Sequence, residues 1–89
     1  MYQFIEGKID ELNPTFVVIN CNGVGYGIEI SVLTAEAIKA LPSVKLLTQL
    51  IVREDAHILY GFHTKAEKDC FNMLTSVSGV GVNTARVIL

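Results

Sequence analysis

The sequence predicts a mainly β fold with some helix: a barrel of five short strands followed by the start of a helical module. Three observations predict it. Short segments up to residue 62 are β-branched or alternate apolar and polar residues, glycine and proline turn signals separate them, and helical periodicity replaces this pattern after residue 63. We therefore expect a β domain over residues 1–63 and the truncated start of a helical domain over residues 64–89.

The first three strands are separated by clear turn signals. Residues 4–10 alternate with period two, and residues 15–19 are β-branched or aromatic. Asn13-Pro14 marks the turn between them. Residues 20–23 have the asparagines and glycine typical of a hairpin turn. Residues 25–30 then form a third strand, whose glycines permit the sharp bending of a barrel corner.

A short helix is expected over residues 34–41. Thr34 is a candidate N-cap, Glu36 lies in the first turn near the positive end of the helix dipole, and Pro42 stops the segment.

Two more strands, residues 44–52 and 57–62, flank the charged turn of residues 53–56. Five strands with a helix between the third and the fourth have the element order of an OB-fold barrel. A small sandwich fits the same periodicity almost as well.

The last third of the sequence reads as helix. Thr64 can cap a helix, with Glu67 at the capping-box spacing. Apolar residues recur at helical spacing at Ala66, Cys70, Leu74 and Val77, with Phe71 and Met73 nearby. A helical pattern resumes at Asn83 and is still running at Leu89, so we expect a fragment of a longer protein.

Composition restricts the possible functions. Hydrophobic residues make up 51% and charged residues 18% of the chain, which predicts a folded domain with some apolar surface available to a partner. The net charge of −2 excludes a globally basic coat for nucleic acid or membrane. No apolar run is long enough for a membrane helix and no secretory signal is visible, so a cytoplasmic protein with two reduced cysteines is expected.

The most informative segment runs from Leu74 to Ile88, as two helical stretches around the glycine turn Gly79-Val80-Gly81. Amides of such a turn and of the next helix start have no internal partners and carry the positive end of the helix dipole, which suits phosphate. The pattern resembles the helix-hairpin-helix motif that grips a DNA backbone without reading sequence. An ordinary α-hairpin with a glycine turn accounts for it about equally well.

Other candidates are weaker. Glu54 and Asp55 are adjacent acids. On sequence alone they form a solvated turn; the functional alternative is that they lie near DNA and repel its phosphates. Three aromatic residues could either pack in the core or stack bases in a groove of the barrel: Tyr26, Tyr60 and Phe62. Core packing is the stronger interpretation.

No catalytic or cofactor chemistry is expected. The spacings of two cysteines and two histidines match no zinc pattern: Cys21, His57, His63 and Cys70. A P-loop is absent from the sequence, and the glycines of residues 23–27 lack the second half of a dinucleotide motif. We therefore expect no metal, no cofactor and no enzymatic activity of the chain on its own.

Four separated motifs, in order along essentially the whole chain, resemble the RuvA family of bacterial Holliday junction-binding proteins: residues 22–26 (NGVGY), 52–56 (VREDA), 59–62 (LYGF) and 78–81 (SGVG). The resemblance implies a homotetramer that binds four-way junction DNA in recombination and repair. It also implies a RuvB ATPase motor, bound through a C-terminal domain outside this sequence, and the junction resolvase RuvC as partners.

The resemblance also implies roles for particular residues. Glu54 and Asp55 match the family's acidic pin, which lies near the crossover and helps to separate strands. Gly79, Val80 and Gly81 match the first hairpin, whose amides meet DNA phosphate, and the next helix starts with Asn83 and Thr84. Val82-Asn83 stands where the family often has Pro-Lys, so a charge-assisted phosphate contact is expected to be missing. Two rival functions are a sequence-neutral single-strand binder and a purely oligomerising domain.

Overall fold

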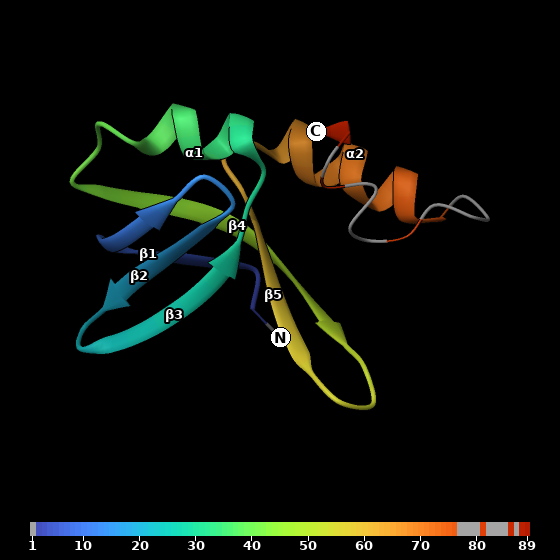
Figure 1. Ribbon diagram of the computed structural model, residues 1–89, viewed down its shortest axis with the longest axis horizontal. Helices are drawn as coiled ribbons and strands as arrows, with labels where there is room; N and C mark the ends of the chain where they lie inside the picture. The colour runs from blue at the N-terminus through green and yellow to red at the C-terminus, as the bar shows by residue number, and fades with distance from the viewer. Residues whose placement is uncertain (1, 77–80, 82–85, 87) are drawn as a thin grey trace.

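Five strands close into one barrel in the spatial order β1-β2-β3-β5-β4 (Figure 1). The structure is a computed structural model and describes residues 2–76, 81, 86, 88 and 89. Its elements, in chain order, are β1 (Phe4–Asn13), β2 (Phe16–Cys21), β3 (Val24–Glu29), α1 (Val32–Ile38), β4 (Ser43–Val52), β5 (His57–Phe62) and α2 (Lys65–Ser76). Closure into a barrel confirms the predicted OB-fold architecture and excludes the sandwich.

Strand β1 closes the barrel because it pairs with two neighbours. Its first half, from Phe4 to Lys8, is antiparallel to β4, and its second half, from Lys8 to Asn13, is antiparallel to β2. A register shift between Ile9 and Glu11 interrupts the pairing with β2. Such a bulge bends a strand, which allows β1 to leave one neighbour and join the next. Strand β1 is therefore longer than the predicted segment of residues 4–10.

The opposite side of the barrel is closed by β3 and β5. These strands run parallel and pair at Glu29 and Tyr60. A Cβ atom on Gly61 would lie 3.3 Å from Leu46 Cδ1 and closer still to Ile28, so only glycine fits here. Buried aliphatic side chains from all five strands and α1 fill the interior: Ile5, Val17, Ile19, Ile28, Ile30, Ala35, Ile38, Val44, Leu46 and Leu59.

Helix α1 begins earlier than predicted, because Ser31 caps it and Thr34 does not. The Thr34 amide donates to Ser31 Oγ at 3.1 Å, and the Ser31 backbone is extended, as at a helix N-cap. Thr34 therefore occupies the third helical position, where it is fully buried. Sequence alone did not separate two hydroxyl residues that are both suited to the cap.

Helix α2 has the predicted cap, since the Glu67 amide donates to Thr64 Oγ1 at 3.2 Å. The predicted apolar stripe is wrong at Ala66 and Cys70, which are exposed, whereas Leu74 is half-buried and packs against Phe71 and its neighbours. Met73 is 70% exposed, and Phe71 is fully buried. Val77 lies outside the described residues. The helix rests only on the outside of the barrel, so it buries a narrow stripe.

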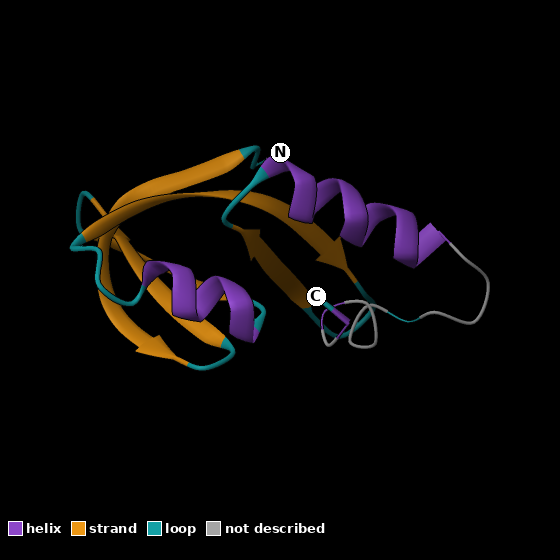
Figure 2. Ribbon diagram, turned by 90° about the horizontal axis from the view of Figure 1, so that it is seen from above, coloured by secondary structure: helices purple, strands orange, loops and turns teal. Residues whose placement is uncertain are grey.

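That stripe forms a second apolar cluster outside the barrel. The Phe71 ring lies 5.4 Å from the Tyr60 ring and 5.0 Å from the Phe62 ring, measured between centroids. Leu47, Ile51, Ile58, Leu74 and Leu89 surround these rings. Phe71 therefore holds α2 against the barrel, where the helix contacts β4 and β5. Figure 2 shows the longer helix lying along the outside of the strands.

Both helices lie at one end of the barrel, and the turn between β4 and β5 lies at the other (Figure 1). Within the described ranges, no helix is long and apolar enough to cross a membrane.

We expect Phe71→Ala to lower the free energy of unfolding by about 3–5 kcal/mol, because it removes a fully buried aromatic side chain and leaves a cavity. Urea unfolding followed by far-UV circular dichroism measures this change. Met73→Ala on the same helix is the control and is expected to stay within about 0.5 kcal/mol of the wild type. Equal effects of the two substitutions would contradict the packing described for α2.

Candidate nucleic-acid interface

The acidic turn, residues 53–56, is the exposed tip of the β4–β5 hairpin. The strand ladder continues to the pair Val52 and His57, and the Arg53 amide then donates to the Ala56 carbonyl oxygen at 2.7 Å. This hydrogen bond closes the turn and places Glu54 and Asp55 at its outer end. Both side chains are exposed.

The two carboxylates form a local concentration of negative charge. Among the described residues, neither Glu54 nor Asp55 takes part in an ion pair. Two unit charges at 4 Å interact with about 1 kcal/mol even in bulk water, so a phosphate brought to this tip would be repelled. The tip can therefore exclude or separate phosphate-bearing strands, and it is unsuited to holding them.

The predicted phosphate-binding turn lies mostly beyond the described residues. Gly79, Val80, Asn83 and Thr84 are outside them. Gly81 is described: it is exposed, and a Cβ atom there would meet no atom of the other described residues within 4 Å. The roles of these five residues stay predictions.

The helix that precedes this turn is fixed to the barrel by a polar contact as well as by the aromatic cluster. Thr34 Oγ1 accepts from Ser31 Oγ at 3.1 Å and donates to Glu67 Oε2 at 2.8 Å. The Glu67 carboxylate thus contacts α1. The Glu67 backbone amide, and not the carboxylate, makes the hydrogen bond to the capping residue Thr64. The first turn of α2 is tied to the N-terminal turn of α1.

The end of the described chain returns to the barrel. The Arg86 guanidinium lies 3.4 Å from Glu29 Oε2 and 6.0 Å from the centroid of the Tyr60 ring. Leu89 packs against the aromatic cluster under α2. These contacts place Arg86 and Leu89 against the β3–β5 side of the barrel.

The acidic turn and the start of α2 lie at opposite ends of β5 (Figure 1). A strand of six residues spans roughly 20 Å, so the acidic turn lies about this far from the start of α2.

Other candidate residues are scattered. Tyr60 and Phe62 are buried and pack as predicted, and Tyr26 is half-buried. Of the two thiols, Cys21 is half-buried and Cys70 exposed, and His57 and His63 are both exposed. The described ranges contain no group of three or more histidine, cysteine or acidic residues arranged to hold a metal.

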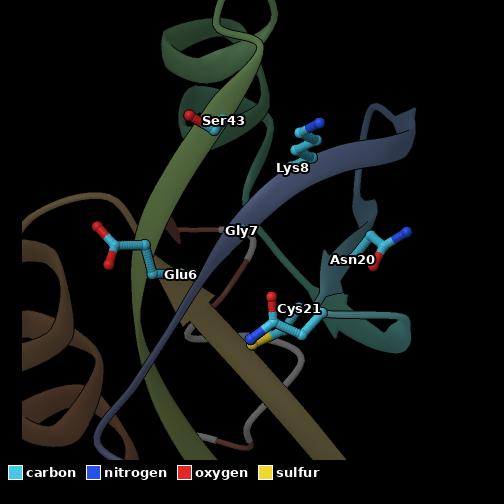
Figure 3. Close-up of a pocket in the computed structure, with 7 residues that line it drawn as sticks. Glu6, Gly7, Lys8, Asn20, Cys21 and Ser43 are labelled. Carbon is cyan, nitrogen blue, oxygen red and sulfur yellow. The ribbon is translucent and has the colours of Figure 1, made fainter.

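A polar depression of about 470 Å³ crosses β1, β2 and the start of β4. Figure 3 shows Glu6 and Lys8 on either side of Gly7, with Asn20 and Cys21 on the neighbouring strand and Ser43 on β4. A Cβ atom on Gly7 would collide with the Asn20 carbonyl oxygen, so the glycine permits the close approach of β1 and β2.

Two exposed aromatic residues, Tyr2 and Phe4, were missed by the sequence reasoning. The exposure of Phe4 could have been predicted, because Phe4 lies on the same face of the strand as Glu6 and Lys8, which point away from the core.

Comparison with known proteins identifies the family. The family described as RuvA N terminal domain matches residues 1–61. Over 89 residues, all of this chain, identity is 52% to the Holliday junction branch migration complex subunit RuvA of Flavobacterium psychrophilum, 51% to that of Bacteroides fragilis and 49% to that of Christiangramia forsetii. The chain spans 46%, 44% and 46% of the length of these relatives. It belongs to the RuvA N-terminal domain family, as the motifs predicted.

We expect Thr34→Val to lower the free energy of unfolding by about 1–3 kcal/mol, because the Ser31 hydroxyl and the Glu67 carboxylate both lose a partner. Thermal and urea unfolding measure the loss. Thr15→Val, at an exposed threonine, is the matched control and should change stability little. Unchanged stability of Thr34→Val would show that this contact does not hold α2 to the barrel.

Proposed function

We propose that this chain is the N-terminal part of a subunit that holds four-way DNA junctions during branch migration in recombination and DNA repair. The observation that carries the proposal is 52% identity along the whole chain to a Holliday junction branch migration complex subunit. The closed barrel supports it, since OB-folds bind oligonucleotides in many proteins.

The subunit acts with partners and is not itself the motor. These 89 residues contain no P-loop, so this part of the subunit would not itself hydrolyse ATP through such a motif. The family resemblance indicates the RuvB ATPase, bound through a C-terminal domain, and RuvC as the resolvase. The complex would act in the bacterial cytoplasm, where chromosomal DNA is accessible.

A homotetramer with fourfold symmetry explains the acidic turn. Four copies would bring four exposed Glu54-Asp55 pairs around one crossover, where their charge repels phosphates and keeps exchanging strands apart. The exposure of these carboxylates and their position at the end of the barrel opposite the helices support this role.

The arms of the junction would be held by the other end of the chain. In this proposal, residues 64–89 start a separate helical domain after the barrel of residues 1–63. Its amides at Gly79, Val80 and Gly81 bind phosphate, and the helix starting with Asn83 and Thr84 adds its positive dipole end. Because backbone amides carry no formal charge, phosphate contacts of this kind need no excess of lysine and arginine, in keeping with a chain whose net charge is −2.

Glu54→Gln combined with Asp55→Asn is expected to raise the affinity of the full-length protein for a four-way junction, by up to roughly thirtyfold, because two repulsive charges are removed. Fluorescence anisotropy with a labelled junction measures the dissociation constant. The matched control is Asp10→Asn with Glu11→Gln, an adjacent exposed acidic pair on β1, which changes the net charge equally. Unchanged or weaker binding by the first variant, or an equal gain by the control, would refute the role of the acidic turn.

Gly81→Val in the full-length protein is expected to weaken junction binding roughly tenfold, because a side chain would stand between the amides and phosphate. The added side chain starts in open space, so circular dichroism should show an intact fold. Gly25→Val is the control: its Cβ would lie 3.4 Å from Val18 on β2, in ordinary contact. Full junction affinity of Gly81→Val would remove this glycine from the proposed site.

A further inference from the structure

Three aromatic side chains lie on the barrel surface and form what we term the aromatic strip: Tyr2, Phe4 and Tyr26. Tyr2 is 49% exposed and Phe4 50% exposed. The Tyr26 ring is half-buried and meets the Tyr2 ring edge to face, with centroids 6.1 Å apart. Exposed apolar rings that gather on one face indicate a surface that a ligand covers.

Phe4 lies between two depressions of the surface. One is a groove of about 460 Å³ between β1, β4 and α2, lined by Gln3, Phe4, Leu47, Gln49, Lys65, Lys68, Asp69 and Asn72. The other, of about 380 Å³, is lined by Tyr2, Phe4, Ile5, Glu6, Cys21, Asn22 and Tyr26. The polar depression of Figure 3 shares Glu6, Cys21 and Asn22 with the second. The strip is therefore part of an extended, hollowed track across the barrel.

Lysines accompany the strip. The Lys45 ammonium lies 4.2 Å from the centroid of the Phe4 ring, and Lys65 and Lys68 line the groove beside it. Two acids oppose them. Asp69 is 3.4 Å from Lys65 in a pair whose side chains are both largely exposed, and Glu6 stands opposite Lys45 in the β1–β4 ladder. Exposed pairs of this kind leave the cations available to an anionic ligand.

We propose that the aromatic strip, with Lys45, Lys65 and Lys68, binds unpaired single-stranded DNA. Single strands offer bases that stack on exposed rings and phosphates that pair with lysines, and this combination tracks a strand without reading its sequence. The bases of a duplex are stacked on one another, so the rings would have no partner there. An acidic peptide would use the lysines but would leave the exposed rings without a stacking partner.

This site goes beyond the proposed grip on junction arms, and it uses different residues. During strand exchange, a base that has left one partner and has not yet met the next is unpaired. A stacking surface on the barrel would hold such bases, while the acidic turn repels phosphates at the other end of β5.

The test measures binding of a labelled oligo-dT single strand and of a four-way junction by the full-length protein, using fluorescence anisotropy at two salt concentrations. We expect Phe4→Ala with Tyr2→Ala to weaken oligo-dT binding roughly tenfold and to leave junction affinity within twofold. Phe4→Leu, which keeps apolar bulk but removes the ring, should weaken oligo-dT binding in the same direction. Lys65→Gln with Lys68→Gln should weaken it and reduce its salt dependence.

Leu33→Ala, at an exposed apolar residue of α1, and Lys39→Gln, at a lysine paired with Glu36, are the controls and should leave oligo-dT binding unchanged. Oligo-dT binding that is absent from the wild type, or unaffected by Phe4→Leu, overturns the inference and leaves the junction proposal intact. A wild type that binds oligo-dT but shows no preference for junctions overturns the proposed function instead. A change of oligomeric state in Phe4→Leu with oligo-dT binding intact would identify the strip as a subunit contact and overturn the inference.

Discussion

Closure of the barrel by β1 is the constraint on which the rest of the structure depends. A single strand of ten residues pairs first with β4 and then with β2, and it can do so because the ladder shifts between Ile9 and Glu11. Gly7 lets β1 approach β2 closely, and Gly61 leaves room for the core on the opposite side. Closure of the barrel fixes the position of each strand, and so it fixes where the turns and helices that follow the strands begin.

Strand β5 connects the acidic turn with helix α2. One end carries the acidic turn, and the other leads into α2, whose Phe71 packs on Tyr60 and Phe62 of the same strand. The acidic turn and the start of α2 are thus held at opposite ends of one strand. Local charge placement therefore matters more than the net charge of −2. Acids gather at the tip, while Lys65 and Lys68 lie beside the aromatic strip.

The location of the acidic turn could be predicted from sequence. Glu54 and Asp55 were predicted at a turn because charged residues separate two apolar strands, and the structure places them at the exposed tip. Core packing was the stronger interpretation of Tyr60 and Phe62, and both are buried. The surface of α2 could not be predicted, because helical spacing does not say which neighbour a helix rests on. The contact of Glu67 with Thr34, 33 residues away, leaves no local signal.

The sequence by itself determined the number, order and type of the elements, because alternation, turn residues and caps act between residues close in the chain. Its separated motifs also determined the family. Only the tertiary structure decided that the strands close into a barrel and that Phe71 and not Cys70 faces the barrel. Both outcomes depend on contacts between residues far apart in the sequence, and such contacts leave no periodic pattern in it.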